Sequence, residues 1–354
     1  MSNSNKPNSA PKWWINSCSQ KFDLDPQHAA ILDTFDFSDI QQDGFVFLEA
    51  LDRVYKIKRE LTTQNVFSDQ AQHGLGASSA IRMMESLANK QERAYEKLYH
   101  WLQQYLHLNQ SIQEQQHQLD PDAMDEALSH PFVRQSLRTL HQSTPAFYSH
   151  TPEMIATSRR IEVTRRFLLV LTAGHDGQAP LEMKAHDPVS YVGDMLAFCF
   201  QACSVEADNV RHIVVSVSEQ EEEKEEYSVQ DDQPTMTAKE MLGHATSGIA
   251  RPLKSRILQV ISSLARKEQD EDEDEAGFEE EEQGAIARSR VSSLYNICGL
   301  LVYYHSTLFK CANKDESNPL VVAIMDCLKE GTEGFAASLR VYAAMIFSTA
   351  YFTS

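Results

Sequence analysis

The stretch SSAIRMMESLANKQERAYEKLYHWLQQYLHL, residues 78–108, shows the clearest periodicity in the chain. Its apolar side chains return at alternating steps of three and four residues, which places them on one face of an α-helix. Gln91 interrupts this stripe, and charged residues occupy the opposite face, as is typical of a long surface helix. The stretch therefore predicts one arm of a rod-like helical hairpin. The stripe consists of Ile81, Met84, Ala88, Gln91, Tyr95, Leu98, Leu102 and Tyr105, and the charged face of Arg82, Glu85, Lys90, Glu92, Arg93, Glu96 and Lys97.

A proline directly after a capping residue marks further helix starts. Asp, Asn or Thr at an N-cap accepts a hydrogen bond from an unpaired backbone amide, and a proline at the next position has no amide to leave unpaired. A capping box over 237–240, in which a threonine and a glutamate bond each other's backbone amides, marks another start. We expect structural caps at Asp187, Thr151, Asn318 and Thr237, and further starts at Asp25-Pro26 and Asp120-Pro121.

Shorter helical patterns fill most of the remaining chain, so the predicted fold class is all-α. HIVVSVS at 212–218 is the exception, because its β-branched residues would suit a strand. The acidic run that follows gives such a strand no partner, and we interpret 212–218 as a helix end or a loop. The helical patterns cover 43–61, 122–141, 152–172, 188–204, 237–266, 286–310 and 319–350, separated by short polar or Gly/Pro-containing links.

Composition divides the chain into three regions. Residues 1–20 form a polar N-terminal segment, 21–110 a helical hairpin or rod region, and 118–354 a helical-bundle region. The Gln-rich, apolar-poor stretch 109–120 is the expected junction. Inside the last region, 268–283 is an acidic insert that we expect to be disordered, because so charged a run has little apolar surface to bury.

Charge and cysteine usage restrict the class of protein. The formal net charge of -19 argues against nucleic-acid binding, since basic patches dominate affinity for phosphate backbones. The six cysteines lack the paired spacing of a zinc site or a disulfide framework, which indicates reduced thiols in the cytosol. The N-terminus has no apolar run of a secretory signal. The apolar stretch 335–354 contains Arg340, and we favour a core helix over a membrane span.

Motifs for catalysis or cofactor binding give no positive signal. His186 with Asp187 would need further ligands from neighbouring helices to bind a metal, and capping by Asp187 explains the pair. Cys199 and Cys203 lie one helical turn apart on an apolar face, where buried small residues are the plainer interpretation. The glycines of HGLGAS at 73–78 lack the other residues of a phosphate loop. We therefore expect no enzyme activity, no catalytic residue, no cofactor and no metal site.

One concentration of positive charge stands out in this acidic chain. It lies in SRRIEVTRRFLLVL, residues 158–171, and consists of Arg159, Arg160, Arg165 and Arg166. These four side chains are candidates for contact with an acidic partner or with anionic lipid headgroups. The alternative, a solvated helix face without a partner, stays open.

Several segments, in order along the chain, resemble subunit 6 of the conserved oligomeric Golgi complex, a vesicle-tethering assembly. The most specific are AHDPVSYVGDMLAF at 185–198 and EMLGHATSGIARPLKSRILQVI at 240–261. The other similar stretches are FLEALDRVYKIKREL at 47–61, SSAIRMMESLANKQERAYEKLYHWLQQ at 78–104, AMDEALSHPFVRQSLRTL at 123–140, SRRIEVTRRFLLVLT at 158–172 and SSLYNICGLLVYYHSTL at 292–308.

This resemblance implies an elongated helical-rod architecture of stacked helical bundles and a scaffold role in retrograde vesicle transport between Golgi cisternae. The implied partners are the other subunits of the complex, with SNAREs and Rab GTPases as further candidates. The implied location is the Golgi membrane, peripheral and on the cytosolic face. The alternative is a subunit of another helical tether or a generic helical adaptor, which would share the fold without the run at 185–198.

The chain departs from the family pattern at its two ends. The family typically has a heptad-rich coiled coil ahead of the region matched here and continues through further helices beyond it. We therefore expect this chain to be truncated relative to the family at both ends, with apolar surface left exposed.

Overall fold

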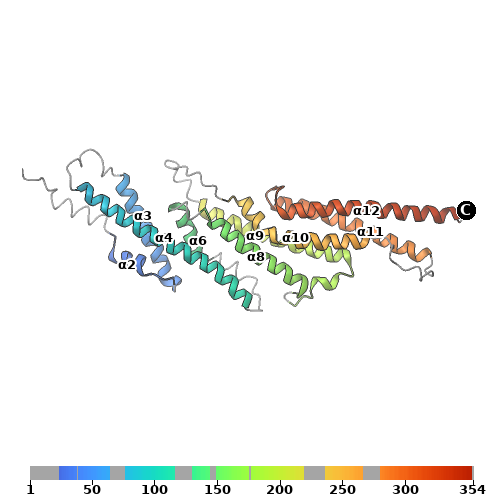
Figure 1. Cartoon of the computed structure of the whole chain (residues 1–354), viewed down its shortest axis with the longest axis horizontal. Helices are drawn as coiled ribbons and strands as arrows, with labels where there is room; N and C mark the ends of the chain where they lie inside the picture. The colour runs from blue at the N-terminus through green and yellow to red at the C-terminus, as the bar shows by residue number, and fades with distance from the viewer. Residues whose placement is uncertain are drawn as a thin grey trace, which may run out of the picture. The chain divides into compact units, whose positions relative to one another are not determined.

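The structure is a computed structural model and describes residues 24–37, 39–63, 76–115, 130–143, 149–174, 177–218, 236–265 and 280–352. All regular structure within these ranges is helical, so the all-α prediction is confirmed. In chain order (Figure 1) the elements are α2 (Pro26–Thr34), the π-helical turn η1 (Ile40–Gly44), α3 (Phe45–Thr63), α4 (Gly76–Gln115), α6 (Pro131–Ser143), α8 (Thr151–Thr172), the 3-10 turn η3 (Leu181–Lys184), α9 (Pro188–Ser218), α10 (Ala238–Ala265), α11 (Glu280–Cys311) and α12 (Pro319–Phe352).

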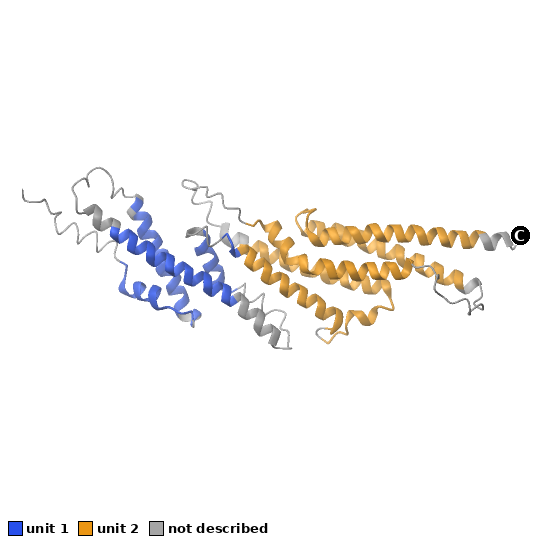
Figure 2. Cartoon of the chain, viewed as in Figure 1, with its two compact units in different colours: residues 1–151, 216–234 blue, residues 152–215, 235–354 orange. Residues whose placement is uncertain are grey.

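The chain forms two compact units (Figure 2). Unit 1 consists of Met1–Thr151 with Ser216–Pro234 and contains α2, η1, α3, α4 and α6. Unit 2 consists of Pro152–Val215 with Thr235–Ser354 and contains almost all of α8, η3, α9, α10, α11 and α12. The division of the chain near 109–120 stays a prediction, because 116–120 lies outside the described residues.

Aromatic rings form the core of unit 1, where α3 packs against α2, α4 and α6. Phe37, in the link between α2 and α3, stacks on Trp101 of α4 with ring centroids 5.5 Å apart and lies 5.2 Å from the ring of Phe47 in α3. Trp101 also meets Phe132 of α6 edge-on at 5.0 Å. Phe37 has a φ of 62°, a conformation that costs a non-glycine residue on the order of 1 kcal/mol. The surrounding rings therefore hold Phe37 in place.

The polar residue that interrupts the apolar stripe of α4 is buried and bonded on both sides. The side-chain oxygen of Gln91 accepts a 2.6 Å hydrogen bond from Lys58 Nζ of α3, and its amide nitrogen donates to Tyr95 Oη at 3.0 Å. Burial lowers the pKa of Lys58. A buried polar group with its partners satisfied adds specificity to a contact, so Gln91 helps to fix which faces of α3 and α4 meet.

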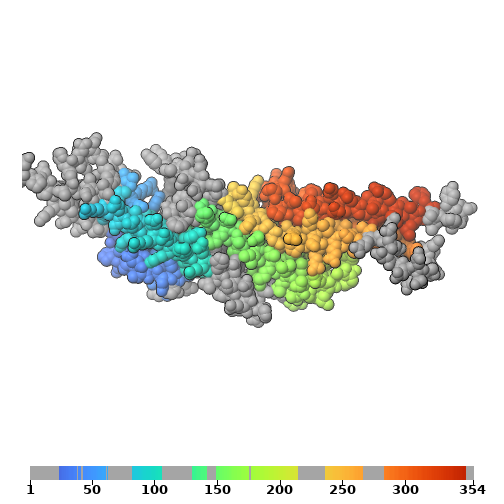
Figure 3. Space-filling model, in the orientation of Figure 1, coloured from blue at the N-terminus to red at the C-terminus, as the bar shows by residue number. Residues whose placement is uncertain are grey.

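In unit 2, α12 packs along both α10 and α11 (Figure 1), and the space-filling view shows it beside α10 (Figure 3). Glycines lie at these contacts. A methyl group built on Gly331 of α12 would lie 3.2 Å from Cys298 Sγ of α11, and one on Gly334 would lie 3.5 Å from Ile261 Cγ2 of α10. Because the distance between helix axes depends on the side chains at the contact, these glycines let α12 approach its two neighbours closely.

One stretch of α10 contains two residues that favour other structures over a helix. A methyl group built on Gly248 would lie 1.9 Å from Thr164 Oγ1 and 3.2 Å from Arg160 Cγ, so α8 crosses α10 directly at this glycine. Pro252 lies one turn further along α10. Its missing amide leaves the carbonyl of Gly248 without the usual intrahelical hydrogen bond. The contact between α8 and α10 therefore falls where α10 is intrinsically weakest.

Two further predictions concern residues 212–218 and the acidic insert at 268–283. Residues 212–218 are the end of α9, which confirms the helix-end interpretation. The acidic insert at 268–283 lies outside the described residues except for 280–283, which form the first turn of α11. For the rest of the insert, the expected disorder stays a prediction. Residues 1–20 and the start at Asp120-Pro121 also lie outside the described residues.

Candidate interaction surfaces

Asp187 lies at the start of α9 and bonds its first turn. Its Oδ2 accepts from the Ser190 hydroxyl at 2.6 Å, and its Oδ1 accepts from the Ser190 amide at 3.2 Å. These hydrogen bonds lower the pKa of Asp187. The neighbouring His186 donates from Nδ1 to the carbonyl oxygen of Met183 at 3.0 Å. The pair therefore closes the turn that leads into α9.

The other three predicted caps, Thr237, Asn318 and Thr151, lie at the starts of α10, α12 and α8. Glu240 Oε2 accepts from the Thr237 amide at 2.7 Å, and Thr237 Oγ1 accepts from the Glu240 amide at 3.3 Å. Asn318 Oδ1 accepts from the amide of Leu320 at 3.0 Å. Thr151 is buried and is the first residue of α8, and its role as a cap stays a prediction.

Arg159 does not lie on the surface of unit 2. Its side chain is 3% exposed and faces that of Glu206 in α9, which is 2% exposed. Arg159 Nε lies 2.9 Å from Glu206 Oε2, and Nη2 lies 2.5 Å from Oε1. Such a bidentate pair keeps either charge from being buried alone. The structure corrects the prediction of a partner or lipid contact for Arg159, because its guanidinium group is bound to Glu206 inside the unit.

The other three arginines of the basic cluster are partly exposed. Arg165 Nε and Arg166 Nε both donate to the buried carboxylate of Glu162 in the same helix, at 3.0 and 2.6 Å. The stem of Arg160 lies against Gly248 of α10. One arginine of the cluster is thus buried, and the other three are partly exposed on α8. Contact of those three with an acidic partner or with lipid stays a prediction.

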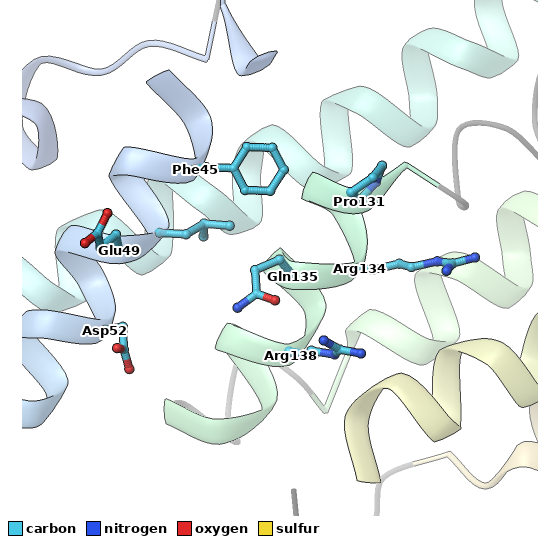
Figure 4. Close-up of a pocket in the computed structure, with 8 residues that line it drawn as sticks. Phe45, Glu49, Asp52, Pro131, Arg134, Gln135 and Arg138 are labelled. Carbon is cyan, nitrogen blue, oxygen red and sulfur yellow. The ribbon is translucent and has the colours of Figure 1, made fainter. Parts of the chain in front are cut away.

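An open hollow of about 500 Å³ lies between α3 and α6 of unit 1 (Figure 4). Glu49 and Asp52 line it from α3, and Arg134 and Arg138 line it from α6. Asp52 is paired with Lys56 at 2.5 Å. Sites for small molecules are lined mostly by apolar side chains, whereas charged groups are prominent in this lining. The hollow therefore suits contact with a protein surface better than enclosure of a small ligand.

The sequence analysis missed a row of exposed apolar residues on α11. Tyr295, Val302 and Tyr303 are 66%, 54% and 63% exposed, and their spacing places them on one side of the helix. Gly299 lies between them, and a methyl group built there would meet no atom within 4 Å. We call these four residues the α11 stripe. Its signal in the sequence is that apolar residues cover more of the circumference of α11 than one packing face requires.

Helix α12 also exposes apolar side chains, among them Leu339, Ile346 and Phe347. Exposed apolar patches typically mark contacts with proteins or membranes. Across the described ranges, no helix combines the length and the apolar character needed to cross a bilayer. The same ranges contain no group of three or more His, Cys, Asp or Glu side chains placed to hold a metal ion. Cys199 and Cys203 are buried in α9, as the plainer interpretation predicted.

Comparison with known proteins identifies the family. The family model described as Conserved Oligomeric Golgi complex subunit 6, C-terminal, matches residues 77–350, a range that runs from the start of α4 almost to the end of α12. The chain belongs to the conserved oligomeric Golgi complex subunit 6 family. The resemblance seen in the sequence is therefore confirmed. The two most specific segments of that resemblance contain the start of α9 and most of α10.

Curated members of the subunit 6 family are similar to much of this chain. Conserved oligomeric Golgi complex subunit 6 of Homo sapiens is 31% identical over 264 residues, which cover 74% of this chain and 32% of the human protein. The protein of the same name from Arabidopsis thaliana is 28% identical over 192 residues, or 52% of this chain and 26% of that protein. The chain thus spans about a quarter to a third of the length of these relatives. No solved structure matches the chain.

Proposed function

We propose that this chain is a scaffold segment of subunit 6 of the conserved oligomeric Golgi complex and acts in vesicle tethering during retrograde transport within the Golgi. The observation that carries this proposal is the family match over 77–350, which includes α4, α6 and every helix of unit 2. On this proposal the chain works by binding other proteins and catalyses no reaction. Its first partners are the other subunits of the complex.

Long packed helices suit a scaffold, since an α-helix advances 1.5 Å per residue and gives reach without chemical turnover. α11 and α12 contain 32 and 34 residues. Each is therefore roughly 50 Å long. One side of α12 is used to pack on α10 and α11. The sides of α11 and α12 that carry exposed apolar residues are then available to partners.

We assign the α11 stripe to contact with an amphipathic helix of another subunit of the complex. Tyrosine contributes strongly to protein interfaces, because its large ring buries much area and its hydroxyl tolerates water at the rim. A partner helix presents apolar side chains at the same three-to-four spacing as the stripe. Gly299 in the middle of the stripe would allow the partner backbone to approach closely.

We further propose that the protein associates peripherally with the Golgi membrane from the cytosolic side, with SNAREs and Rab GTPases as additional partners. The relatives' name supports a Golgi location, and cysteines without disulfide spacing fit the cytosolic side. Arg160, Arg165 and Arg166 are the candidates for anionic lipid headgroups, since each basic residue near such a surface adds attraction.

Affinity purification tests the scaffold proposal. The protein is tagged at its own locus, purified from its own cells and analysed by mass spectrometry. We expect the other subunits of the conserved oligomeric Golgi complex to be recovered with it. Recovery of none of them, from cells in which the tagged protein is expressed and folded, would overturn the proposal.

A charged variant of the α11 stripe tests the assigned surface. Val302→Lys combined with Tyr303→Glu places charges at two exposed positions, so the fold should persist while recovery of sister subunits falls on the order of tenfold. Gln259→Lys combined with Ser262→Glu, at exposed polar positions of α10, is the matched control. Equal recovery with both variants would show that the stripe is not the contact.

A further inference from the structure

Helices α11 and α12 pack along each other in unit 2 (Figure 1). The rings of Tyr295 in α11 and Phe335 in α12 have centroids 5.9 Å apart. Two turns away, Arg288 Nε of α11 donates a 2.9 Å hydrogen bond to Tyr342 Oη of α12. From the first contact to the second, residue numbers fall in α11 and rise in α12, so the two helices are antiparallel. Side chains spaced in register with these contacts therefore lie along one line.

The side of this line that faces away from α10 carries exposed apolar residues of α12. A methyl group built on Gly334 would lie 3.5 Å from Ile261 of α10, and the next residue, Phe335, is turned by about 100° and meets α11. Leu339 and Ile346 follow Phe335 by four and eleven residues, and these steps turn the helix further in the same sense. Their side chains are 42% and 48% exposed. They therefore lie beyond the α11 contact, on the side away from α10.

The α11 stripe supplies the other half of this surface. Tyr295, Gly299 and Val302 follow Arg288 by seven, eleven and fourteen residues, which places all four on one side of α11. Tyr295 joins the two halves, because its ring is 66% exposed and also contacts α12. We define the α11–α12 face as the α11 stripe together with Arg288, Phe335, Leu339 and Ile346.

This part of unit 2 has the opposite charge to the whole chain. Residues 283–302 of α11 and 335–347 of α12 contain Arg288, Arg290 and Arg340 and no aspartate, glutamate or lysine, whereas the chain has a formal net charge of -19. Arg288 and Arg340 are exposed, and Arg290 is half-buried. Interfaces pair surfaces of complementary charge, so an apolar face bordered by arginines favours an occupant that is both apolar and acidic.

Other occupants fit this combination less well. A second copy of the chain that used the same face would bring arginines against arginines. An anionic bilayer would meet the glutamates at 280–282, with which α11 begins, and would repel them. The acidic run at 268–275 of this chain has seven acidic residues among its eight and no apolar one, so it offers nothing to cover Leu339 and Ile346.

We propose that the α11–α12 face binds an acidic amphipathic helix of another subunit of the complex. Apolar side chains of this helix cover Tyr295, Leu339 and Ile346, and its carboxylates lie at Arg288 and Arg340. The inference rests on the proposed function of the α11 stripe and adds the charge of the partner. The apolar contacts supply most of the affinity, whereas the arginines select the partner and speed its encounter with the face.

Peptide binding tests the charge of the partner. The probes are two fluorescent peptides of about 20 residues with the same leucines at heptad spacing and either glutamates or lysines beside them. Fluorescence anisotropy measures their binding to the purified chain. We expect the glutamate peptide to bind about tenfold more tightly, by a margin that shrinks at high salt. The net charge of -19 would by itself favour the lysine peptide, so a preference for glutamate requires a local basic surface.

Two matched pairs of variants test whether binding occurs at this face. Arg340→Glu should weaken binding of the glutamate peptide about tenfold, whereas Arg251→Glu makes the same charge change at an exposed position of α10 and should leave binding unchanged. Leu339→Ser should weaken it several-fold, whereas Leu168→Ser, at a leucine of α8 that is 44% exposed, should not. All four positions are exposed, so the variants should melt close to the parent chain.

Three results would overturn the proposal. Equal binding of both peptides, weakened by Leu339→Ser, would show that the face binds helices without selecting acidic ones, and the proposed function of the α11 stripe would stand. Equal binding of the glutamate peptide to Arg340→Glu and Arg251→Glu would place the contact elsewhere. Binding of neither peptide to the folded chain would remove the acidic helix as the occupant, while affinity purification decides the scaffold function separately.

Two further measurements identify a different occupant. Dimers of the purified chain that Leu339→Ser dissociates, detected by analytical ultracentrifugation, would assign the face to a second copy. Binding to phosphatidylserine vesicles that Leu339→Ser abolishes and Leu168→Ser does not would assign it to a bilayer. Either result would overturn the proposal, and we expect a monomer that leaves such vesicles unbound through this face.

Discussion

Units 1 and 2 pack long helices by different means. In unit 1, large rings such as Trp101 and Phe132 fill the space between elements and fix their positions by shape. In unit 2, Gly248 lets α8 and α10 touch, and the buried pair of Arg159 and Glu206 joins α8 to α9. A mispaired arrangement would leave those two charges buried alone, which is strongly unfavourable. Both units share the same amphipathic periodicity, so periodicity alone does not decide how helices pack.

The largest effect should come from breaking the buried ion pair of unit 2. Glu206→Ala removes the carboxylate that faces the buried guanidinium group of Arg159, and we expect the free energy of unfolding to fall by about 3–5 kcal/mol. Chemical denaturation measures the loss, and hydrogen exchange should show it in α8 and α9. Asp208→Ala, which removes an exposed ion pair on the same helix, should cost no more than about 1 kcal/mol. Equal losses in the two variants would contradict the role of the buried pair.

A somewhat smaller loss should follow from removing a ring of unit 1. Phe132→Ala deletes a fully buried ring, and such changes cost about 3–5 kcal/mol. We expect the lower end of that range, because the adjacent hollow leaves neighbouring side chains room to relax. Phe45→Ala is the control, since Phe45 is 44% exposed. Hydrogen exchange that speeds up in unit 2 as much as in unit 1 would contradict the assignment of Phe132 to the core of unit 1.

A glycine-to-alanine comparison tests the close contact of α8 and α10. Gly248→Ala pushes a methyl group into Thr164, and overpacking of this kind costs about 1–3 kcal/mol, less what alanine gains in helix propensity. Gly299→Ala on α11 meets open space and should instead stabilise by about 0.5–1 kcal/mol. Thermal melts of the two variants should therefore shift in opposite directions. A rise in Tm for both would show that Thr164 gives way easily.

The smallest effect concerns the start of α9. Asp187→Ala removes two hydrogen bonds to Ser190 and should lower Tm by a small amount. Because those bonds lower the pKa of Asp187 below its ordinary value of 3.8, its carboxylate stabilises the fold above that pH, and this contribution is lost as the pH falls through the folded-state pKa. The Asp187→Asn variant should keep the cap, but its stability should lack this dependence on pH. Melts of the three proteins between pH 3 and 7 check both statements.

The helices could be predicted because their signals are local. The caps before Pro188 and Pro319 and the stripe of α4 depend only on neighbours within a turn or two, and the structure begins α9 and α12 at those prolines. The family could be recognised because the runs around α9 and α10 are long and specific. The extent of the helices was harder to predict, since α9 continues to Ser218 through β-branched residues that other contexts place in strands.

The roles of individual charged residues could not be predicted. Arg159 and Arg160 are adjacent and identical in type, yet the first is buried and the second is not. The difference comes from Glu206 of α9, which lies 47 residues from Arg159 along the chain and accepts hydrogen bonds from its guanidinium group. The same holds for Gln91, whose burial depends on Lys58 of another helix. Pairings over such distances are set by tertiary packing, which a pattern within one helix does not contain.

The weakness of α10 has a consequence for how the protein is made. Glycine and proline inside a helix cost about 1 and 3 kcal/mol relative to alanine, so Gly248 and Pro252 leave α10 a poor helix by itself. It depends on α8, which the ribosome delivers before it, and on α12, which begins only at Pro319. Before α12 has been synthesised, α10 of the nascent chain would therefore lack one of the helices on which it packs. Unit 2 becomes a finished bundle only after α12 has been synthesised.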